Sequence, residues 1–309
     1  MSDSPQNALQ RFFDGDVWFS FRTSPVAIVA AVVAGIMILG AVFAPWVAPH
    51  QPFDLASLSL NDSLIPPVWT DEGRAAYLLG TDDQGRDVFS TILYGSRISL
   101  LVGIASVAFA MVLGIGLGLL SGYLGGRLDA FIMRVADVQL SFPAILIALL
   151  INGVARAVLP SDANIDAMAL AVLIGSIGLA NWVQYARTVR GSTMVEKNRE
   201  YVQAARVIGI TPLAIMRRHL LPNVLGPVLV LATINIATAI ITEATLSFLG
   251  VGVPPTQPSL GTLIRVGNDF LFSGEWWITI FPGAALVAMV LSINLLGDWL
   301  RDALNPKLR

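Results

Sequence analysis

Long apolar segments alternate with polar segments along this chain of 309 residues. Six of the apolar segments have roughly the length that an α-helix needs to cross the hydrocarbon core of a bilayer, about 20 residues. The pattern therefore predicts an all-α membrane protein with six transmembrane helices, whose ends are defined to within a few residues. The predicted spans are residues 26–47, 98–122, 130–152, 167–186, 223–250 and 277–299.

The first apolar segment could also be read as a secretory signal. Residues 26–45 carry no charge, and a polar segment of 25 residues precedes them. Because a signal-peptide core has only about 7–15 apolar residues, we interpret this segment as a retained transmembrane helix. Trp46, Trp276 and Trp277 lie at predicted span ends, where aromatic rings favour the membrane interface, although Trp182 lies inside a span.

The composition supports the membrane class and excludes several kinds of site. Only 13% of the residues are charged, against about 25% in soluble proteins, and the mean hydropathy is +0.71. The net charge of −2 gives no basic field for nucleic acid. The chain has no cysteine, and its two histidines, His50 and His219, are far apart in sequence. We therefore expect no catalytic residue, metal site or cofactor on this chain.

The distribution of Lys and Arg predicts which side of the membrane each polar segment faces. With the N-terminus in the cytoplasm, 14 of the 19 Lys and Arg residues fall in cytoplasmic segments. The other five are Arg74, Arg86, Arg97, Arg156 and Arg265. Because short cytoplasmic loops are enriched in Lys and Arg, we expect both termini and loop 187–222 in the cytoplasm. Loop 48–97 is then extracytoplasmic.

The predicted extracytoplasmic loop is acidic and ends in an amphipathic stretch. Its carboxylate residues are Asp54, Asp62, Asp71, Glu72, Asp82, Asp83 and Asp87. In the stretch GTDDQGRDVFSTILYGSRISL, the apolar residues Val88, Phe89, Ile92 and Leu93 fall on one face of a helix. We expect a short amphipathic helix that lies on the outer surface and leads into the second span, with a solvated loop as the alternative.

The second span carries a strip of small residues at every fourth position. These residues are Ser106, Ala110, Gly114, Gly118 and Gly122. Small residues allow close backbone approach, which drives helix association in lipid. The strip predicts a tight helix–helix contact, either within this chain or with a partner, and we favour the contact within the chain.

A few polar residues lie within or beside the predicted spans. Arg134 and Asp137 are three residues apart near the start of the third span and could form an ion pair. Asn235 and Glu243 lie in the fifth span, and each is a candidate for lining a polar pathway. Glu243 is roughly 30 Å from the start of this span, so its carboxylate could instead simply reach the interface. Pro143 is expected to kink the third span.

The polar segment EYVQAARVIGITPLAIMRRHLLPN, between the fourth and fifth spans, predicts two short helices and a tight turn. The first helix runs to Ile208, with Val202, Ala205, Val207 and Ile208 available for burial. Gly209 can adopt the left-handed conformation that ends a helix. Thr211 offers a capping oxygen, Pro212 suits the first helical position, and Leu213 to Leu221 form the second helix. Pro222 is expected to end the second helix where the next span begins.

Two other interpretations of this segment are weaker. A DNA-binding helix-turn-helix does not fit, because both flanks enter the bilayer directly. An amphipathic loop on lipid headgroups is compatible with the basic residues, but the capping signals favour a rigid structure. A rigid structure joined to two spans can receive a push from a cytoplasmic partner and tilt the spans.

This segment resembles the EAA loop of permease subunits in ATP-binding-cassette importers. The chain reads Gln203-Ala204-Ala205, then Gly209, then His219-Leu220-Leu221-Pro222, with the family's spacing intact. Gln203 stands where the family has Glu, and His219 where it has Ile, so the polar contact of that Glu is in doubt. In the family this loop forms the coupling helix, which docks in a groove on the ATPase subunit.

Three further motifs resemble peptide permeases of the dipeptide and oligopeptide type, and are closest to the C-type subunit. They are LGTDDQGRDVFSTILYGSRISL at 79–100, EATLSFLGVGVPPTQPSLG at 243–261 and GDWLRDALNPKLR at 297–309. Leu260 stands where Trp is usual, and Asn305 where Asp is usual. The resemblance runs from about residue 26 to the end. It implies a five-helix, MetI-like type I importer core preceded by one N-terminal helix.

The resemblance also implies a domain order. Residues 1–25 form a cytoplasmic tail, 26–97 the first helix and the extracytoplasmic loop, 98–300 the permease core with coupling loop 198–222, and 301–309 a second cytoplasmic tail. The implied ATPase-coupling residues are Gln203, Ala204, Ala205, Gly209, Leu213, His219, Leu221 and Pro222.

The implied function is that of a transmembrane subunit in the bacterial inner membrane, importing peptides or related small solutes. Its implied partners are a second permease, two ATPase subunits, an extracytoplasmic substrate-binding protein and membrane lipid, with no nucleic acid. The chain has no G-x-x-x-x-G-K-[ST] phosphate loop, so ATP hydrolysis is expected on the separate subunits.

Several alternative functions remain. Within the family, the solute could be nickel or an opine-like compound. A secondary transporter is disfavoured because neither midplane ionisable groups nor inverted repeats are evident. A sensory or structural membrane subunit would tolerate a bulky residue at Gly209, whereas we expect such a residue to weaken ATPase docking.

Overall fold

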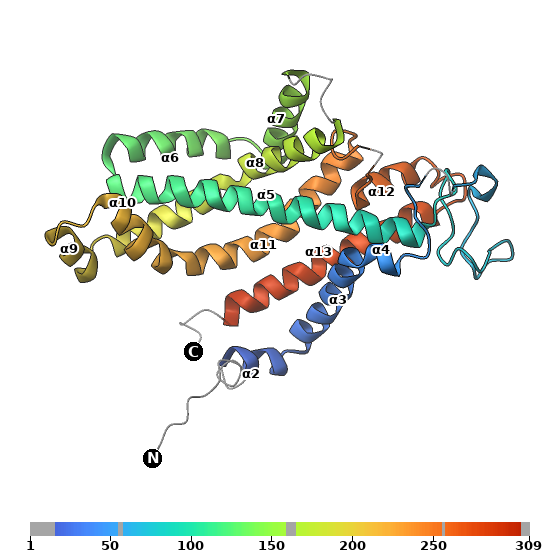
Figure 1. Cartoon of the computed structure of the whole chain (residues 1–309), viewed down its shortest axis with the longest axis horizontal. Helices are drawn as coiled ribbons and strands as arrows, with labels where there is room; N and C mark the ends of the chain where they lie inside the picture. Colours follow the sequence, from blue (N-terminus) through green and yellow to red (C-terminus); the bar gives the residue numbers. More distant parts are fainter. Residues whose placement is uncertain (1–15, 55–57, 159–164, 255–256, 304–309) are drawn as a thin grey trace, which may run out of the picture.

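The structure is a computed structural model that describes residues 16–54, 58–158, 165–254 and 257–303. These residues form an elongated bundle of helices (Figure 1). The helices are α2 (Asp16–Thr23), α3 (Pro25–Val42), α4 (Ala44–Val47), α5 (Val88–Leu124), α6 (Gly126–Leu140), α7 (Ala144–Val158), α8 (Ile165–Glu196), α9 (Glu200–Val207), α10 (Pro212–Ile215), α11 (Leu221–Phe248), α12 (Leu260–Asn268) and α13 (Trp277–Ala303).

The long helices α5, α8, α11 and α13 run along the bundle and contact one another. Residues 197–220, which we call the elbow, lie at one end of the bundle, which we call the elbow end. The polar segment 48–87 lies at the opposite end, the loop end, together with α12 (Figure 1). Both described termini point away from the loop end, as the prediction of six spans requires.

Five described helices are long and apolar enough to cross a membrane, and a bent pair, α6 and α7, adds a sixth candidate. This confirms the predicted fold class. The third predicted span is not one straight helix, because α6 and α7 meet at 98°. Pro143 lies at the break, where its ring and missing N–H prevent the helix from continuing. The predicted kink is therefore a sharp corner.

The strip of small residues on α5 packs within the chain, against α8. A Cβ atom on Gly114 would lie 2.4 Å from the Cβ of Tyr185, and one on Gly118 would lie 2.6 Å from the carbonyl oxygen of Ala186. Such contacts leave room only for glycine. The prediction that the strip packs internally is confirmed, and it explains why α5 and α8 share the largest contact in the molecule.

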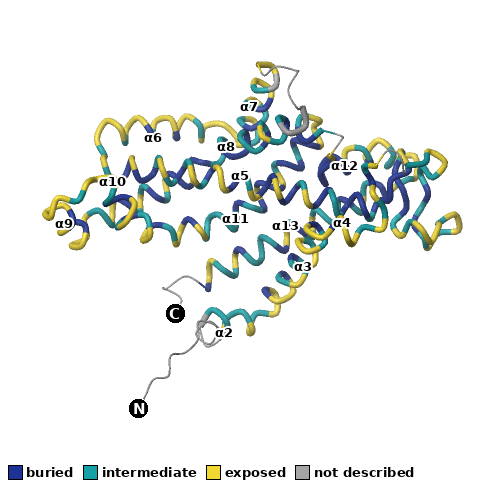
Figure 2. The backbone as a smooth tube through the Cα atoms, viewed as in Figure 1, coloured by how far each residue is buried: buried dark blue, intermediate teal, exposed yellow. Residues whose placement is uncertain are grey.

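The N-terminal helix α3 uses alanines for the same purpose. Ala27, Ala30, Ala34 and Ala41 are buried, and α3 packs mainly against α13 and α5. The opposite face of α3 is exposed and apolar, as expected for a helix that faces lipid (Figure 2).

The start of α5 differs from the expected separate surface helix. Residues 81–87 form a compact turn, and one unbroken helix then runs from Val88 into the membrane span. Asp87 begins this helix, because its carboxylate accepts hydrogen bonds from the Ser90 amide at 2.9 Å and the Ser90 hydroxyl at 2.6 Å. Val88 and Ile92 are buried against the protein instead of lying on the membrane surface.

The turn before α5 is held by buried polar contacts. Arg86 pairs with Asp82 at 2.6 Å, and both side chains are almost fully buried. The other oxygen of Asp82 accepts the backbone amides of Gln84 and Arg86, both at 2.9 Å. The indole of Trp277, at the start of α13, donates to the carbonyl oxygen of Thr81 at 3.0 Å. The acidic loop is therefore tied to the helix bundle.

The predicted ion pair between Arg134 and Asp137 is wrong. Asp137 pairs instead with Arg187 of α8, which faces α6 across the bundle. A second carboxylate of α6, Asp129, accepts hydrogen bonds from the guanidinium of Arg190 through both of its oxygens, at 2.5 and 2.7 Å. Spacing along one helix could not reveal that α8 supplies the partner for both carboxylates.

Candidate functional site

The elbow consists of a short helix, a glycine turn and a second helical segment. Helix α9 ends at Val207, and Gly209 follows in the left-handed conformation, with φ of +79°. The amide of Ile210 donates to the carbonyl oxygen of Ala205 at 3.0 Å and closes the turn. The predicted order of helix, tight turn and helix is confirmed, and so is the position of Gly209 in the turn that ends the first helix. Thr211 has the backbone of an N-cap residue, but its side chain makes no capping bond.

The second half of the elbow continues directly into α11, so the prediction that Pro222 separates the two is wrong. Residues 212–248 form one helical rod. A π turn at Met216–Leu220 lies just before Pro222, and the amide of Leu221 donates to Met216, five residues back. The wider turn accommodates a proline ring that would clash with the preceding turn of a regular α-helix.

Buried residues anchor both halves of the elbow to the bundle. Val202 and Ala205 of α9 are buried, as predicted. Ile215, Met216 and Leu220 are buried at the start of the rod, and all five residues belong to the largest apolar cluster of the protein. The elbow is therefore continuous with the core.

Polar contacts fix the elbow between α8 and α11. The Tyr201 hydroxyl donates to the carboxylate of Glu196 at 2.7 Å and accepts from the amide of Asn223 at 3.1 Å. Burial and the bond to Glu196 raise the pKa of Tyr201 above its usual value. Because Glu196 lies on α8 and Asn223 on α11, Tyr201 joins three helices.

Two basic side chains attach the elbow to the end of α5. The Lys197 ammonium donates to the carbonyl oxygen of Gly122 at 2.7 Å. The guanidinium of Arg206 lies 5.1 Å from the centre of the Tyr123 ring, within the range of a cation–π interaction. These contacts hold the elbow to α5 as well as to α8 and α11.

The tip of the elbow exposes apolar side chains. Val207 is 87% exposed, Ile208 is 74% exposed and Leu213 is 72% exposed. The expected burial of Val207 and Ile208 is wrong, because the buried stripe of α9 is only Val202 and Ala205, and Ile208 has already left the helix. We call these three residues the apolar tip. The signal in the sequence that could have revealed this exposed patch is the position of all three apolar residues within four residues of the turn at Gly209.

The predicted coupling residues fall into two groups. Gln203, Ala204, Gly209, Leu213 and Pro222 are exposed, whereas Ala205 is buried and His219 and Leu221 are half-buried. The exposed group shares the surface of the elbow with the apolar tip, although Pro222 lies further along the rod. Ala205, His219 and Leu221 lie beneath that surface and pack toward the interior of the bundle.

The two candidates for pathway lining take part in contacts between helices. The Asn235 amide donates to the side-chain oxygen of Gln184 on α8 at 3.3 Å. Glu243 is 0% exposed, so the alternative that its carboxylate simply reaches the interface is wrong. It accepts hydrogen bonds from the hydroxyls of Ser99 and Ser247, both at 2.7 Å. Neither side chain faces open space in this conformation.

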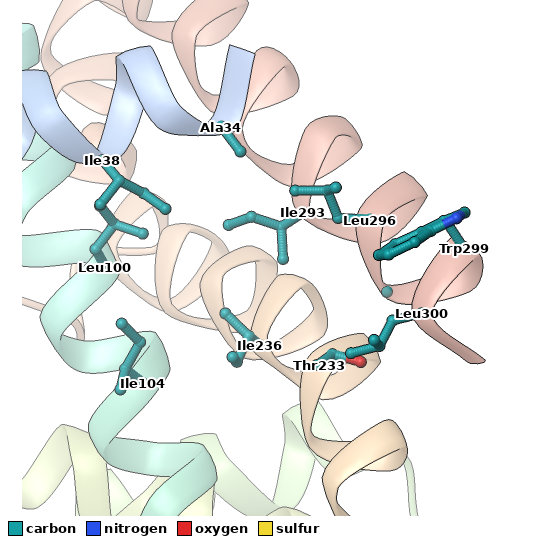
Figure 3. Close-up of a pocket in the computed structure, with 11 residues that line it drawn as sticks. Ala34, Ile38, Leu100, Ile104, Thr233, Ile236, Ile293, Leu296, Trp299 and Leu300 are labelled. Carbon is teal, nitrogen blue, oxygen red and sulfur yellow. The ribbon is translucent and has the colours of Figure 1, made fainter. Parts of the chain in front are cut away.

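A cavity of about 350 Å³ lies where α3, α5, α11 and α13 meet (Figure 3). Its apolar lining includes Ile38, Leu100, Ile104, Ile236, Ile293 and Leu296. The hydroxyl of Thr233 also faces the cavity but donates to the carbonyl oxygen of Val230 at 2.8 Å. A peptide would find no polar partner here, so this cavity is not fitted to a polar solute.

Among the described residues, no group of three or more His, Asp or Glu side chains is placed to hold a metal ion. The arrangement of the site is suited to mechanical work. A stiff elbow with an exposed apolar tip is joined without a break to a helix that crosses the bundle.

Known proteins are similar to this chain in sequence and in fold. Residues 114–309 match the family described as binding-protein-dependent transport system inner membrane component, and residues 11–67 match the N-terminal TM domain of oligopeptide transport permease C. The chain is 40% identical to the dipeptide transport system permease protein DppC of Haemophilus influenzae, over the whole of both chains. It is 38% identical to the di/tripeptide transport system permease protein DppC of Pseudomonas aeruginosa, over 95% of this chain and 92% of that protein.

The fold is also found among solved structures. An inward-facing structure of the MetNI methionine ABC transporter superposes with a TM-score of 0.53, at 22% identity, over 70% of this chain and 96% of that chain. This similarity confirms the predicted permease fold. The chain therefore belongs to the family of binding-protein-dependent transport system inner membrane components.

Proposed function

We propose that this chain is a permease subunit of an ATP-driven importer of dipeptides or other short peptides, and that its elbow couples ATP hydrolysis to transport. The observation that carries the proposal is the elbow itself. Its apolar tip is exposed although the adjoining residues are buried in the core. An exposed apolar patch on a rigid support is typical of a surface that binds a partner protein.

The proposed mechanism is alternating access driven from the elbow. Two ATPase subunits bind on the cytoplasmic side of the complex, and the elbow of this chain docks on one of them. The Lys and Arg distribution favours the cytoplasmic side for the elbow and for both termini. Closure of the ATPase subunits displaces the elbow, and the helical rod 212–248 carries the displacement across the bundle. A second permease subunit completes the pathway, and a binding protein delivers the solute from the other side.

The proposed substrate class rests on the relatives, whose names refer to dipeptides and tripeptides. Nickel complexes and opine-like compounds remain alternative solutes within the resembling family. A ligand screen on the binding protein that delivers solute to this chain would distinguish them.

Co-purification tests the coupling role. Gly209→Val forces a β-branched residue into the left-handed region, which should displace the apolar tip. We expect the ATPase subunits to be lost from the purified complex and peptide uptake to fall with them. Gly274→Val is the matched control, because Gly274 also has a positive φ, of +110°, and open space around it, but lies far from the elbow.

Two outcomes would contradict the proposal. If Gly209→Val retained both the ATPase subunits and uptake, the elbow would not be the coupling element. If this chain alone transported solute into vesicles without an ATPase, the chain would be a secondary transporter.

A further inference from the structure

Glu243 lies near the end of α11 that is furthest from the elbow, and it is completely buried. One carboxylate oxygen accepts from the Ser99 hydroxyl of α5, and the other accepts from the Ser247 hydroxyl of α11, both at 2.7 Å. The carboxyl group therefore connects α5 and α11, and Ser259, the N-cap residue of α12, adjoins it.

The backbone at the start of α12 is part of the same network. The amide of Leu260, the first residue of α12, donates to the Ser99 hydroxyl at 3.3 Å, and that hydroxyl in turn donates to Glu243. The free amides and the dipole of a helix N-terminus favour a nearby negative charge. Among the described residues no ion pair involves Glu243, so its partners are hydroxyl groups and the start of α12.

Close backbone contacts hold α12 in the same place. A Cβ atom on Gly261 would lie 2.3 Å from the carbonyl oxygen of Ala244 on α11. A Cβ atom on Gly95 of α5 would lie 3.3 Å from the amide nitrogen of Leu260. The start of α12 thus packs closely against both α5 and α11, next to Glu243. We call this contact region of α5, α11 and the start of α12 the wedge.

The helical rod links this wedge to the elbow. It is continuous from Pro212, which begins the second half of the elbow, through Glu243 to Phe248. Asn235 lies on the same rod and bonds to α8, and Val228 and Ile240 are buried against the neighbouring helices. Because the helix is continuous, it can carry a displacement of the elbow to the residues around Glu243.

We propose that Glu243 is a positioning residue that locks α12 to the far end of the helical rod, so that α12 moves with the rod when the elbow is displaced. In the importer proposed above, on which this inference rests, α12 is then the element that opens and closes the loop end of the pathway. Loss of the hydrogen bonds of Glu243 then leaves the rate of ATP hydrolysis unchanged but lowers the amount of peptide imported per ATP hydrolysed.

The test uses the complete importer, with both permeases, the ATPase subunits and the binding protein, reconstituted in proteoliposomes. The variants are Glu243→Ala, which removes the lock, Glu243→Gln, which keeps the shape but removes the charge, and Ser99→Ala. Thr242→Ala is the matched control, because this neighbouring residue is half-buried and, among the described residues, its hydroxyl donates to the carbonyl oxygen of Thr238 on its own helix.

The first measurement is the amount of dipeptide imported per ATP hydrolysed. We expect this ratio to fall about tenfold in Glu243→Ala, the factor that corresponds to losing one hydrogen bond to a charged group. Ser99→Ala and Glu243→Gln should lie between Glu243→Ala and the wild type, and Thr242→Ala should match the wild type. A merely structural role would lower ATP hydrolysis and import together, and that result would overturn the proposal.

The second measurement is the distance between spin labels on α5 and beside α12. The chain has no native cysteine, so labels can be placed cleanly at Leu101 and Phe272, which are both exposed. The wild type should give one narrow distance distribution, and Glu243→Ala a broad one. An unchanged distribution in Glu243→Ala would overturn the lock even if the wild-type complex imported no peptide, so the two proposals can fail separately.

Discussion

The elbow end and the loop end of the bundle distribute polar and apolar groups in opposite ways. At the elbow end, the apolar tip formed by Val207, Ile208 and Leu213 is exposed. At the loop end, the charged pair Asp82 and Arg86 is buried. A surface that exposes apolar groups gains free energy by binding a partner, whereas buried polar contacts stabilise the chain by themselves. The difference suggests that the loop end is complete in isolation and the elbow end is not.

The largest contrast is expected between ion pairs at the two ends. Asp82→Ala leaves the Arg86 guanidinium buried without its partner, and should cost about 3–5 kcal/mol of unfolding free energy. Arg199→Ala, at the elbow, removes a pair with Glu196 that is largely exposed, and should cost less than about 1 kcal/mol. Thermal unfolding of the purified chain in detergent measures both. Equal losses of unfolding free energy in the two variants would mean that ion pairs stabilise both ends of the bundle to the same extent.

A pair of glycines sharpens the comparison. Gly80 and Gly209 have nearly the same backbone, with φ of +84° and +79°. A Cβ atom at Gly80 would lie 2.5 Å from the carbonyl oxygen of Ile65, whereas one at Gly209 meets open space. Gly80→Ala should therefore cost about 3 kcal/mol, from strain plus overlap. Gly209→Ala should cost only the strain, about 1 kcal/mol. Equal decreases in the unfolding midpoints of Gly80→Ala and Gly209→Ala would refute the predicted difference between the two positions.

Helix caps provide a smaller contrast. Asp87→Ala removes the side chain that accepts two hydrogen bonds at the start of α5, and should cost about 1 kcal/mol. Thr211→Ala, at the N-cap of α10, removes a hydroxyl that makes no capping bond, and should change stability by less than about 0.5 kcal/mol. A larger effect at Thr211 than at Asp87 in the same unfolding assay would contradict the structure.

The smallest effect on stability is expected at the apolar tip. Replacing Val207, Ile208 and Leu213 together by Ser changes only exposed side chains, so each substitution should alter the unfolding free energy by less than about 0.5 kcal/mol. The same variant should fail to retain the ATPase subunits during purification. Loss of folded protein would show that the tip stabilises the chain itself, and retained ATPase would show that the partner binds elsewhere.

Features set by a single residue or a simple period could be predicted from the sequence. Gly209 was identified because few other residues adopt the left-handed conformation that ends a helix. The glycines of α5 were identified by their four-residue period, and the contact they predicted lies within the chain. Run length and hydropathy alone were enough to indicate the membrane spans.

Features that depend on which helices become neighbours could not be predicted. Pro222 is ordinarily a helix terminator, and nothing in its local sequence indicates that a π turn would accommodate it. Asp137 has a basic residue three positions away on its own helix, but its partner is Arg187 of α8. The depth of Glu243 could be counted along the helix, whereas one of its two hydrogen-bonding serines, Ser99, comes from a distant segment.

The unbroken rod at residues 212–248 has a geometric consequence. Its 37 residues, which include the π turn and Pro227, measure roughly 55 Å along the helix axis, nearly twice the thickness of a hydrocarbon core of about 30 Å. If one end is held, a tilt of about 5° sweeps the other end through at most about 5 Å, a distance similar to one helical turn. A lever of this length magnifies a small rotation, so a modest push at one membrane surface is enough to move side chains past one another at the opposite surface.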